Sequence, residues 1–382
     1  MKKYVIPILS RIIILVMLFL FTVIIYETFT AINTAFRHWD AYYQVEIAIR
    51  GYGDKLNVLW AFYPLFPIIV RGMYYLTRDI TATIIITVTI NSIFFIIGMV
   101  LLYKIVEMLR GKVNIFSYTI AVFLPSSIFC SLIYAESIFF LLATLFLYLL
   151  IKRRYFLASL TGALVGLARP TSLFLVAYIV YLDERLSRKM LYIFIIILGF
   201  LSFNIYGYFR LGIFPATEIA RRTFWPYAHI NFFRVFLWYI DALFKDSFMV
   251  FLRFPWRIVT EYDLYWAIRA LYFFPFIFLI ISYCLWQMFR DLSVKDLFKF
   301  RKDPHECLKI GTIVFMLLHF CLWGYGIPYS FHRYILVPLI FLIVFSTFNK
   351  RLFLPIMYLE SVFLLAFAWM YVHPYHWTTF IG

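Results

Sequence analysis

Long apolar runs follow one another along the chain, and they constrain its fold more than any other feature. The first covers residues 4–29 and a later one covers residues 80–106. Each exceeds the roughly 20 residues that a helix needs to cross a bilayer. The runs are continuous rather than alternating in polarity, so they predict helices. Because lipid offers the backbone no hydrogen bonds, we expect an all-α, polytopic transmembrane helical bundle, with residues 1–382 as one integral membrane domain.

The composition points to the same class of protein. Of the 382 residues, 65% are hydrophobic and 14% are charged, whereas a soluble domain has about 25% charged residues. The net charge is +16, but the basic residues gather in short loops between the runs. Membrane topology therefore explains them, and we expect no nucleic-acid partner. The four cysteines show neither metal-ligand nor disulfide spacing.

The basic loops predict how the helices alternate across the membrane. Basic residues cluster at Lys2 and Lys3, at residues 152–154 and at residues 290–309, and cytoplasmic loops are enriched in Lys and Arg. All these clusters lie on one side if residues 80–106 run inward and the later spans alternate. That arrangement gives about 11 spans.

Two stretches are too short to be ordinary spans. Residues 60–76 are rich in proline and aromatic residues and only marginally long. We expect them to form an interfacial or re-entrant helix inside a first outer loop of about residues 30–79. Residues 155–168 and 171–182 form a second short pair, which we interpret as partial spans that meet near Arg169.

This topology gathers most of the unusual ionisable groups on the outer face. Charged groups at membrane depth are costly and tend to mark pathways or sites. A long outer segment of about residues 211–262 carries Arg221 and Arg222, which are candidates for anion binding or, alternatively, for attraction to lipid head groups. The other candidates are Asp40 with its neighbours, Tyr134 with Glu136, Arg169, and His332 with Arg333.

Asp40 is the candidate general base. It follows the first apolar run closely, and Trp39, Tyr43 and Glu46 share helical spacing beside it, so the segment can lie amphipathically on the membrane. A carboxylate in an aromatic, partly desolvated setting can accept a hydroxyl proton; the alternative is a solvated loop residue. Asp40 with Glu46 also leaves a divalent metal open, although no dense carboxylate cluster demands one and no cofactor is required.

Glu136 and Arg169 each have a functional and a structural interpretation. Glu136 stands between two strongly apolar segments, beside Tyr134. Pro170 follows Arg169 and breaks the helix there, which frees backbone groups that need partners. The two side chains therefore belong to a substrate site or form a structural ion pair between helices, and the sequence favours neither.

Arg333 and His332 are candidates for binding a phosphate, with Arg169 as a third. They follow a turn-rich segment and precede an apolar run. The planar guanidinium group suits bidentate recognition of phosphate and stays charged. Interfacial anchoring by long basic side chains is the alternative.

Four short motifs resemble the PIG-V family of membrane mannosyltransferases. Two lie in the first outer loop: His-Trp-Asp-Ala-Tyr-Tyr at residues 38–43 and Ala-Phe-Tyr-Pro-Leu-Phe-Pro at residues 61–67. Two follow later: Pro-Ser-Ser-Ile-Phe at residues 125–129 and Tyr-Ala-Glu-Ser at residues 134–137. The first-loop match joins several residue types over a long stretch, which makes it more specific than a lone short motif.

The resemblance implies a GT-C glycosyltransferase, which takes a sugar from a polyprenyl (dolichyl) phosphate donor on the extracytoplasmic or lumenal face. The catalytic Asp of the family maps to Asp40, and the family also carries arginines near Arg169 and Arg333. After Arg169 this chain has Pro170-Thr171 where eukaryotic members have Ser-Asn-Gly. The acceptor, a lipid-linked molecule or a glycan, therefore stays undefined.

We therefore expect a multi-pass glycosyltransferase, in particular a mannosyltransferase of inverting type, with membrane lipids around it. It would lie in the plasma membrane of a prokaryote or the endoplasmic reticulum of a eukaryote. A transporter or flippase of lipid-linked sugars is the first alternative, and it predicts matching halves that the sequence does not show. A non-catalytic membrane subunit is the second, and it would leave Asp40 replaceable.

Overall fold

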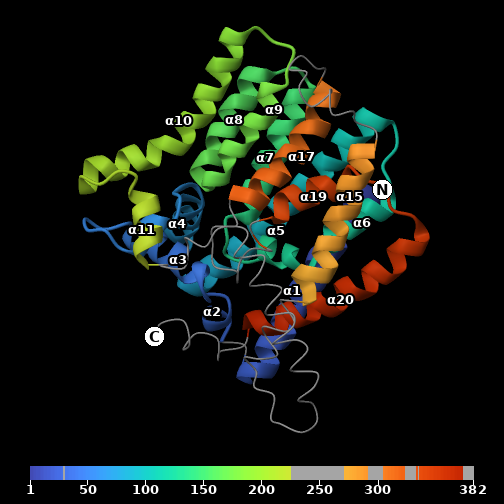
Figure 1. The fold of residues 1–382 in the computed structure, drawn as a ribbon. Helices are drawn as coiled ribbons and strands as arrows, with labels where there is room; N and C mark the ends of the chain where they lie inside the picture. Colours follow the sequence, from blue (N-terminus) through green and yellow to red (C-terminus); the bar gives the residue numbers. More distant parts are fainter. Residues whose placement is uncertain (29–30, 225–270, 291–303, 323–332, 334, 373–382) are drawn as a thin grey trace.

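A computed structural model of the chain describes residues 1–28, 31–224, 271–290, 304–322, 333 and 335–372. The regular elements of these residues are helices, arranged as a bundle (Figure 1). In chain order they are α1 (Lys2–Tyr26), α2 (Ile32–Ala35), α3 (Asp40–Arg50), η2 (Val58–Ala61), α4 (Leu65–Thr77), α5 (Ile80–Arg110), α6 (Ile115–Phe123), η3 (Pro125–Ser131), α7 (Glu136–Ile151), α8 (Tyr155–Ala168), η4 (Pro170–Leu175), α9 (Val176–Val180), α10 (Leu186–Leu211), α11 (Ala216–Phe224), η7 (Tyr272–Ile277), α15 (Phe278–Arg290), α17 (Pro304–Leu322), α19 (Leu336–Val344) and α20 (Lys350–Val372).

Four of the described helices are long and apolar enough to cross a membrane. They are α1, α5, α10 and α20, with 25, 31, 26 and 23 residues. Helices η3 and α7 would make a fifth span together, although they meet at a bend of 98°. With the apolar composition, these helices identify an integral membrane protein. The expected total of about 11 spans is not reached among the described residues, because the other apolar helices there are shorter: α4, α8, η4 with α9, and α15 with part of η7.

Helix boundaries follow the sequence signals closely. The run over residues 80–106 is α5, which begins where the Asp79 side chain accepts a hydrogen bond from Ala82 N at 2.7 Å. It ends at Gly111, whose φ of 68° gives a left-handed cap. The short stretch over residues 155–168 is α8, with the bounds that its apolar residues predict.

Residues Leu65–Thr77, within the predicted first outer loop, form the short helix α4. Helix α4 has 13 residues, which span about 20 Å, whereas the hydrocarbon core of a bilayer is about 30 Å thick. It packs on α3 and α5, and Arg71 Nε donates a 2.7 Å hydrogen bond to Ala48 O at the end of α3. This length fits an interfacial or re-entrant helix better than a full span.

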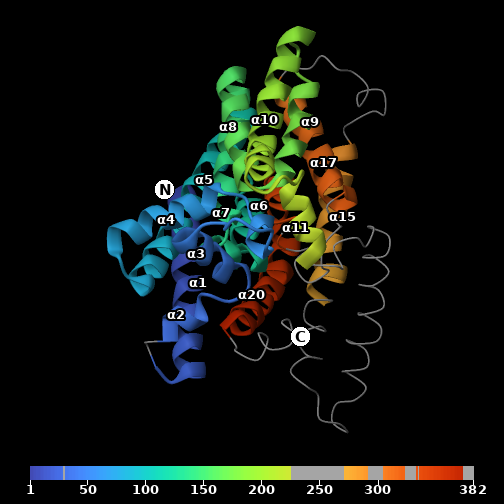
Figure 2. The same cartoon turned by 90° about the vertical axis from the view of Figure 1, so that its left-hand side faces the viewer.

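Close packing of small residues joins α8 to α10. Figure 2 shows these helices side by side with α9 at one end of the bundle. A Cβ atom added to Gly199 on α10 would collide with the backbone of Ala163 on α8, so only glycine permits this approach. The packing fixes the direction of α8 and hence the position of Arg169 at its end.

Candidate active site

Two carboxylates and two guanidinium groups form a continuous ion network. Arg333 Nη2 lies 2.6 Å from Asp40 Oδ2, and Arg333 Nε lies 2.9 Å from Glu136 Oε1. Arg169 donates a hydrogen bond to the same Glu136 oxygen. The order is therefore Asp40, Arg333, Glu136, Arg169, and the four formal charges cancel. All four residues were candidates in the sequence, and Arg333 links Asp40 to the pair of Glu136 and Arg169.

Burial differs sharply along this network. The side chain of Glu136 is 1% exposed, that of Arg333 6% and that of Arg169 12%, whereas that of Asp40 is 26% exposed. Buried charges require partners because desolvation costs several kcal/mol for each ion. The buried members therefore satisfy one another, and Asp40 is the more exposed of the two carboxylates.

Helix ends position each member of the network. Asp40 and Glu136 are the first residues of α3 and α7. The positive end of the helix dipole stabilises the charged form of a carboxylate at this position. Arg169 is the C-cap of α8, in an extended conformation with φ −156° and ψ 144°, because the following Pro170 disfavours a helical residue before it. Arg333 lies just ahead of α19.

The segment between α6 and α7, which contains the 3-10 helix η3, is held by two buried polar residues that were not candidates in the sequence. Arg11 of α1 donates hydrogen bonds to Ser127 O at 2.7 Å and to Ser127 Oγ at 2.8 Å. Asn91 of α5 donates to Leu132 O and, at 3.1 Å, to Tyr134 O. Both lie inside apolar runs, where strongly polar side chains are rare. Their position in these runs could have marked them as candidates.

Aromatic side chains surround the network, as the motif predicts. Arg333 lies over the ring of Tyr134 at 5.0 Å and over that of Phe129 at 5.8 Å, within the range of cation–π contacts. The Tyr134 hydroxyl donates a 3.4 Å hydrogen bond to His38 O. Tyr371 of α20 packs edge-on against Trp39 with ring centroids 5.8 Å apart; nothing in the sequence marks Tyr371 as part of this site.

Tyr43 and Glu46 lie on α3 but outside the four-residue network. Burial, then the nearby charge of Asp40, raises the pKa of Tyr43 above its usual range, so its hydroxyl stays protonated. Glu46 lies 3.6 Å from Arg37 and 3.3 Å from Arg50. Six residues turn a helix by about 240°, so Glu46 and Asp40 point in different directions. A metal bridging these two carboxylates therefore does not fit the geometry.

Arg221 and Arg222 pair with a neighbour on their own helix. Arg221 Nη2 lies 2.8 Å and Arg222 Nε 2.6 Å from the carboxylate of Glu218 on α11. Burial would raise the pKa of Glu218, but hydrogen bonds and charge from both arginines outweigh it and lower that pKa. An anion-binding role for the two arginines stays a prediction. His332 lies outside the described residues.

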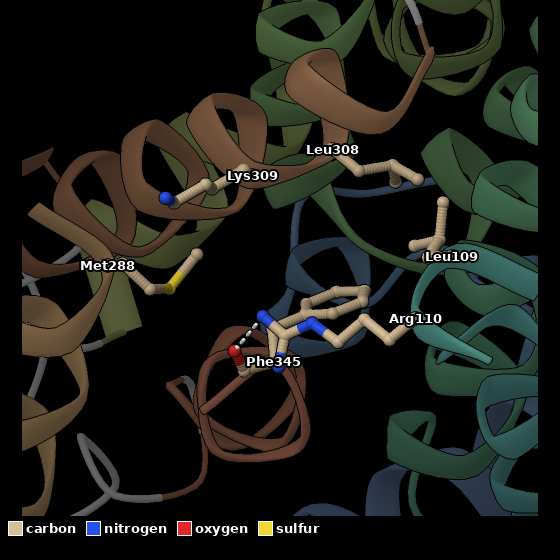
Figure 3. Close-up of a pocket in the computed structure, with 6 residues that line it drawn as sticks. All are labelled: Leu109, Arg110, Met288, Leu308, Lys309 and Phe345. Carbon is tan, nitrogen blue, oxygen red and sulfur yellow. Dashed lines mark hydrogen bonds between the residues drawn. The ribbon is translucent and has the colours of Figure 1, made fainter. Parts of the chain in front are cut away.

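A small pocket lies at the opposite end of α19 from the network. Arg110 Nη2 donates a 2.7 Å hydrogen bond to Phe345 O there (Figure 3). Phe345 is the C-cap of α19, whose 9 residues rise about 14 Å, whereas Arg333 precedes the first residue of that helix. The lining residues are Leu109, Arg110, Met288, Leu308, Lys309 and Phe345. This pocket is therefore separate from the network around Asp40.

The fold and the network together define an integral membrane protein with a partly exposed carboxylate held among buried arginines. No protein-family model matches the chain. Among curated proteins, GPI mannosyltransferase 2 of Schizosaccharomyces pombe is 29% identical over 138 residues, which are 36% of this chain and 29% of that protein. The chain thus matches less than a third of its relative's length. It is a distant and partial homologue of a mannosyltransferase, which agrees with the family that its motifs resemble.

Proposed function

We propose that the protein is a membrane glycosyltransferase that moves a sugar, mannose in particular, from a polyprenyl-phosphate donor to a hydroxyl of a lipid-linked or glycan acceptor. The observation that carries this proposal is the 2.6 Å contact between Asp40 Oδ2 and Arg333 Nη2. It joins a carboxylate that can act as a base to a cation that can bind the donor phosphate. The partial similarity to GPI mannosyltransferase 2 supports sugar transfer.

The proposed reaction is a single displacement with inversion at the anomeric carbon. Asp40 takes the proton of the acceptor hydroxyl, and the acceptor oxygen bonds to the anomeric carbon from the face opposite the phosphate. The bond between the anomeric carbon and the phosphate oxygen breaks, and its electron pair stays on the phosphate. Arg333 stabilises the negative charge that develops on that leaving group.

The depth of the network favours a lipid-linked donor. Helix α7 has 16 residues and α8 has 14, so they rise about 24 Å and 21 Å between the basic segment at residues 152–154 and the network. With residues 152–154 at one boundary of a bilayer core of about 30 Å, as in the proposed topology, Glu136 and Arg169 would lie roughly 6–9 Å below the opposite boundary. A phosphate on a polyprenyl chain can reach that depth from within the bilayer, whereas a nucleotide sugar would have to leave water.

Sugar transfer by purified Asp40→Asn protein tests the proposal. Asparagine is nearly isosteric but cannot take the proton, so turnover should fall by about 10²–10⁴-fold, the usual range for a positioned base. Donor binding and folding should survive, because Asn still offers Arg333 an oxygen. The assay supplies several polyprenyl-phosphate sugars and detects the glycosylated acceptor by mass spectrometry.

The matched control is Glu46→Gln, which removes a carboxylate from the same helix but one that pairs with Arg37 and Arg50. It should keep near-normal transfer. Near-normal transfer by Asp40→Asn would refute Asp40 as the base. Donor binding by the wild-type protein without formation of any glycosidic bond would favour the transporter of lipid-linked sugars.

A further inference from the structure

Arg333 stands between two carboxylates of very different exposure. The Nη2 atom of its guanidinium group lies 2.6 Å from Asp40 Oδ2, and the Nε atom lies 2.9 Å from Glu136 Oε1. In the proposed reaction the same group must also contact the donor phosphate. Asp40 and the phosphate are both anions, and both would bind the guanidinium group of Arg333. They therefore compete for it.

We propose that Arg333 releases Asp40 and binds the donor phosphate when the donor arrives. Glu136 is the positioning residue that keeps its contact with Arg333 during this exchange. Arrival of the phosphate then releases Asp40 Oδ2 to meet the acceptor hydroxyl. The donor consequently binds before the acceptor can be activated. This inference rests on the proposed function and adds to it an order of events and a role for Glu136.

Three features make Glu136 the fixed member of the network. It is 1% exposed, it begins α7, and Arg169 binds the oxygen that also contacts Arg333. Its other oxygen, Oε2, is buried and has no hydrogen-bond partner among the residues that the structure describes. Glu136 Oε2 can therefore accept a hydrogen bond from Arg333 as the guanidinium group turns from Asp40 towards the phosphate.

Asp40 is the partner that the phosphate displaces from Arg333 in this arrangement. Its side chain is 26% exposed, so water can solvate the carboxylate once the guanidinium leaves it. Linkage requires that two ligands which compete for one group weaken each other's binding equally. Removal of the Asp40 charge should therefore tighten binding of the phosphate while it abolishes transfer, a combination that loss of a merely structural residue would not produce.

A double-mutant cycle tests the exchange, with a polyprenyl phosphate that lacks the sugar as the probe. Binding is measured by intrinsic tryptophan fluorescence in detergent for wild type, Asp40→Asn, Arg333→Gln and the double variant. Asp40→Asn should tighten binding about 5- to 10-fold, the lower part of the usual range for coupled sites. In the Arg333→Gln background the same change should have little effect. Arg333→Met replaces Arg333→Gln if that variant fails to fold, because methionine also removes the charge.

The outcomes separate the exchange from simpler explanations. Equal tightening with and without Arg333 would mean that Asp40 only repels the phosphate, and it would overturn the exchange. Unchanged or weaker binding in Asp40→Asn would also overturn it. Failure of the wild-type protein to bind any polyprenyl phosphate would instead count against the proposed function. Glu46→Gln is again the control for loss of an acidic charge from α3.

The positioning role of Glu136 is tested by separating binding from turnover. Glu136→Gln removes a negative neighbour of Arg333, so polyprenyl phosphate should bind no more weakly. Transfer at saturating donor should nevertheless fall by up to about 100-fold, because small displacements of a positioned group are costly. Parallel loss of binding, transfer and folded protein would identify Glu136 as structural only and overturn this role.

Discussion

Substitution of Arg11 should weaken the segment that presents Glu136. Arg11 lies inside α1 and is 1% exposed, and besides its bonds to Ser127 it donates to Val122 O at 3.3 Å and to Ser131 Oγ at 3.2 Å. Its guanidinium group also stacks over the ring of Phe95 at 4.0 Å. These contacts supply donors to carbonyls at the end of α6 and in η3, where regular helical hydrogen bonding ends.

The size of the effect follows from the groups left behind in Arg11→Met. The buried Ser127 carbonyl would lose its Arg11 donor, at about 1–3 kcal/mol, and the hydroxyls of Ser127 and Ser131 would each lose one donor. The Val122 carbonyl keeps a 3.3 Å hydrogen bond from Ser127 Oγ. Removal of a desolvated cation offsets part of this loss, so we expect a net destabilisation of about 2–4 kcal/mol. At about 2 °C per kcal/mol for a chain of this size, the unfolding temperature should fall by roughly 4–8 °C.

Thermal unfolding in detergent, followed by tryptophan fluorescence, measures this change. The control is Ile12→Met, because Ile12 is the next residue on the same helix and is 53% exposed. Arg11→Lys should give an intermediate loss, since one ammonium group cannot reach the same set of acceptors. If Arg11→Met unfolds at the same temperature as Ile12→Met, then these hydrogen bonds do not stabilise the segment before α7.

Two further predictions concern topology and donor binding. A single cysteine at position 40 should react with a membrane-impermeant reagent only from the side opposite to a cysteine at position 153; labelling of both from one side would contradict the assignment from basic loops. Arg333→Lys keeps the charge but loses the planar fork, so it should weaken binding of polyprenyl phosphate. Unchanged binding in both Arg333→Lys and Arg333→Ala would leave Arg333 as an interfacial anchor.

The sequence predicts the helices of this fold better than it predicts the contacts of the site. Hydrophobic run length determines α1, α5 and α8, because lipid admits few alternatives to a helix. The pair of Glu136 with Arg169 was one of two open interpretations, and the structure contains it. The contact of Asp40 with Arg333 could not be derived, because it depends on how distant helices pack. The separation of Glu46 from Asp40, by contrast, follows from helical periodicity alone.

The position of Arg333 also matches where charge must move in the proposed reaction. A polyprenyl-phosphate sugar is a phosphodiester with one negative charge, and the polyprenyl phosphate that leaves can carry two. Asp40 becomes neutral as it takes the acceptor proton, so one unit of negative charge is lost at Asp40 and gained at the phosphate. The net charge of the site does not change, which matters at a depth where uncompensated charge is costly.

A guanidinium group placed between the origin and the destination of that charge stabilises both ends of the reaction. It contacts Asp40 before the donor arrives and would contact the phosphate as the charge develops there, with little reorganisation of its buried partner Glu136. A lysine ammonium has a single nitrogen, whereas the guanidinium group contacts Asp40 through Nη2 and Glu136 through Nε. Arg333→Lys should therefore lower both turnover at saturating donor and affinity for the donor. An effect on affinity alone would show that Arg333 binds the phosphate but does not stabilise the charge that develops on it during transfer.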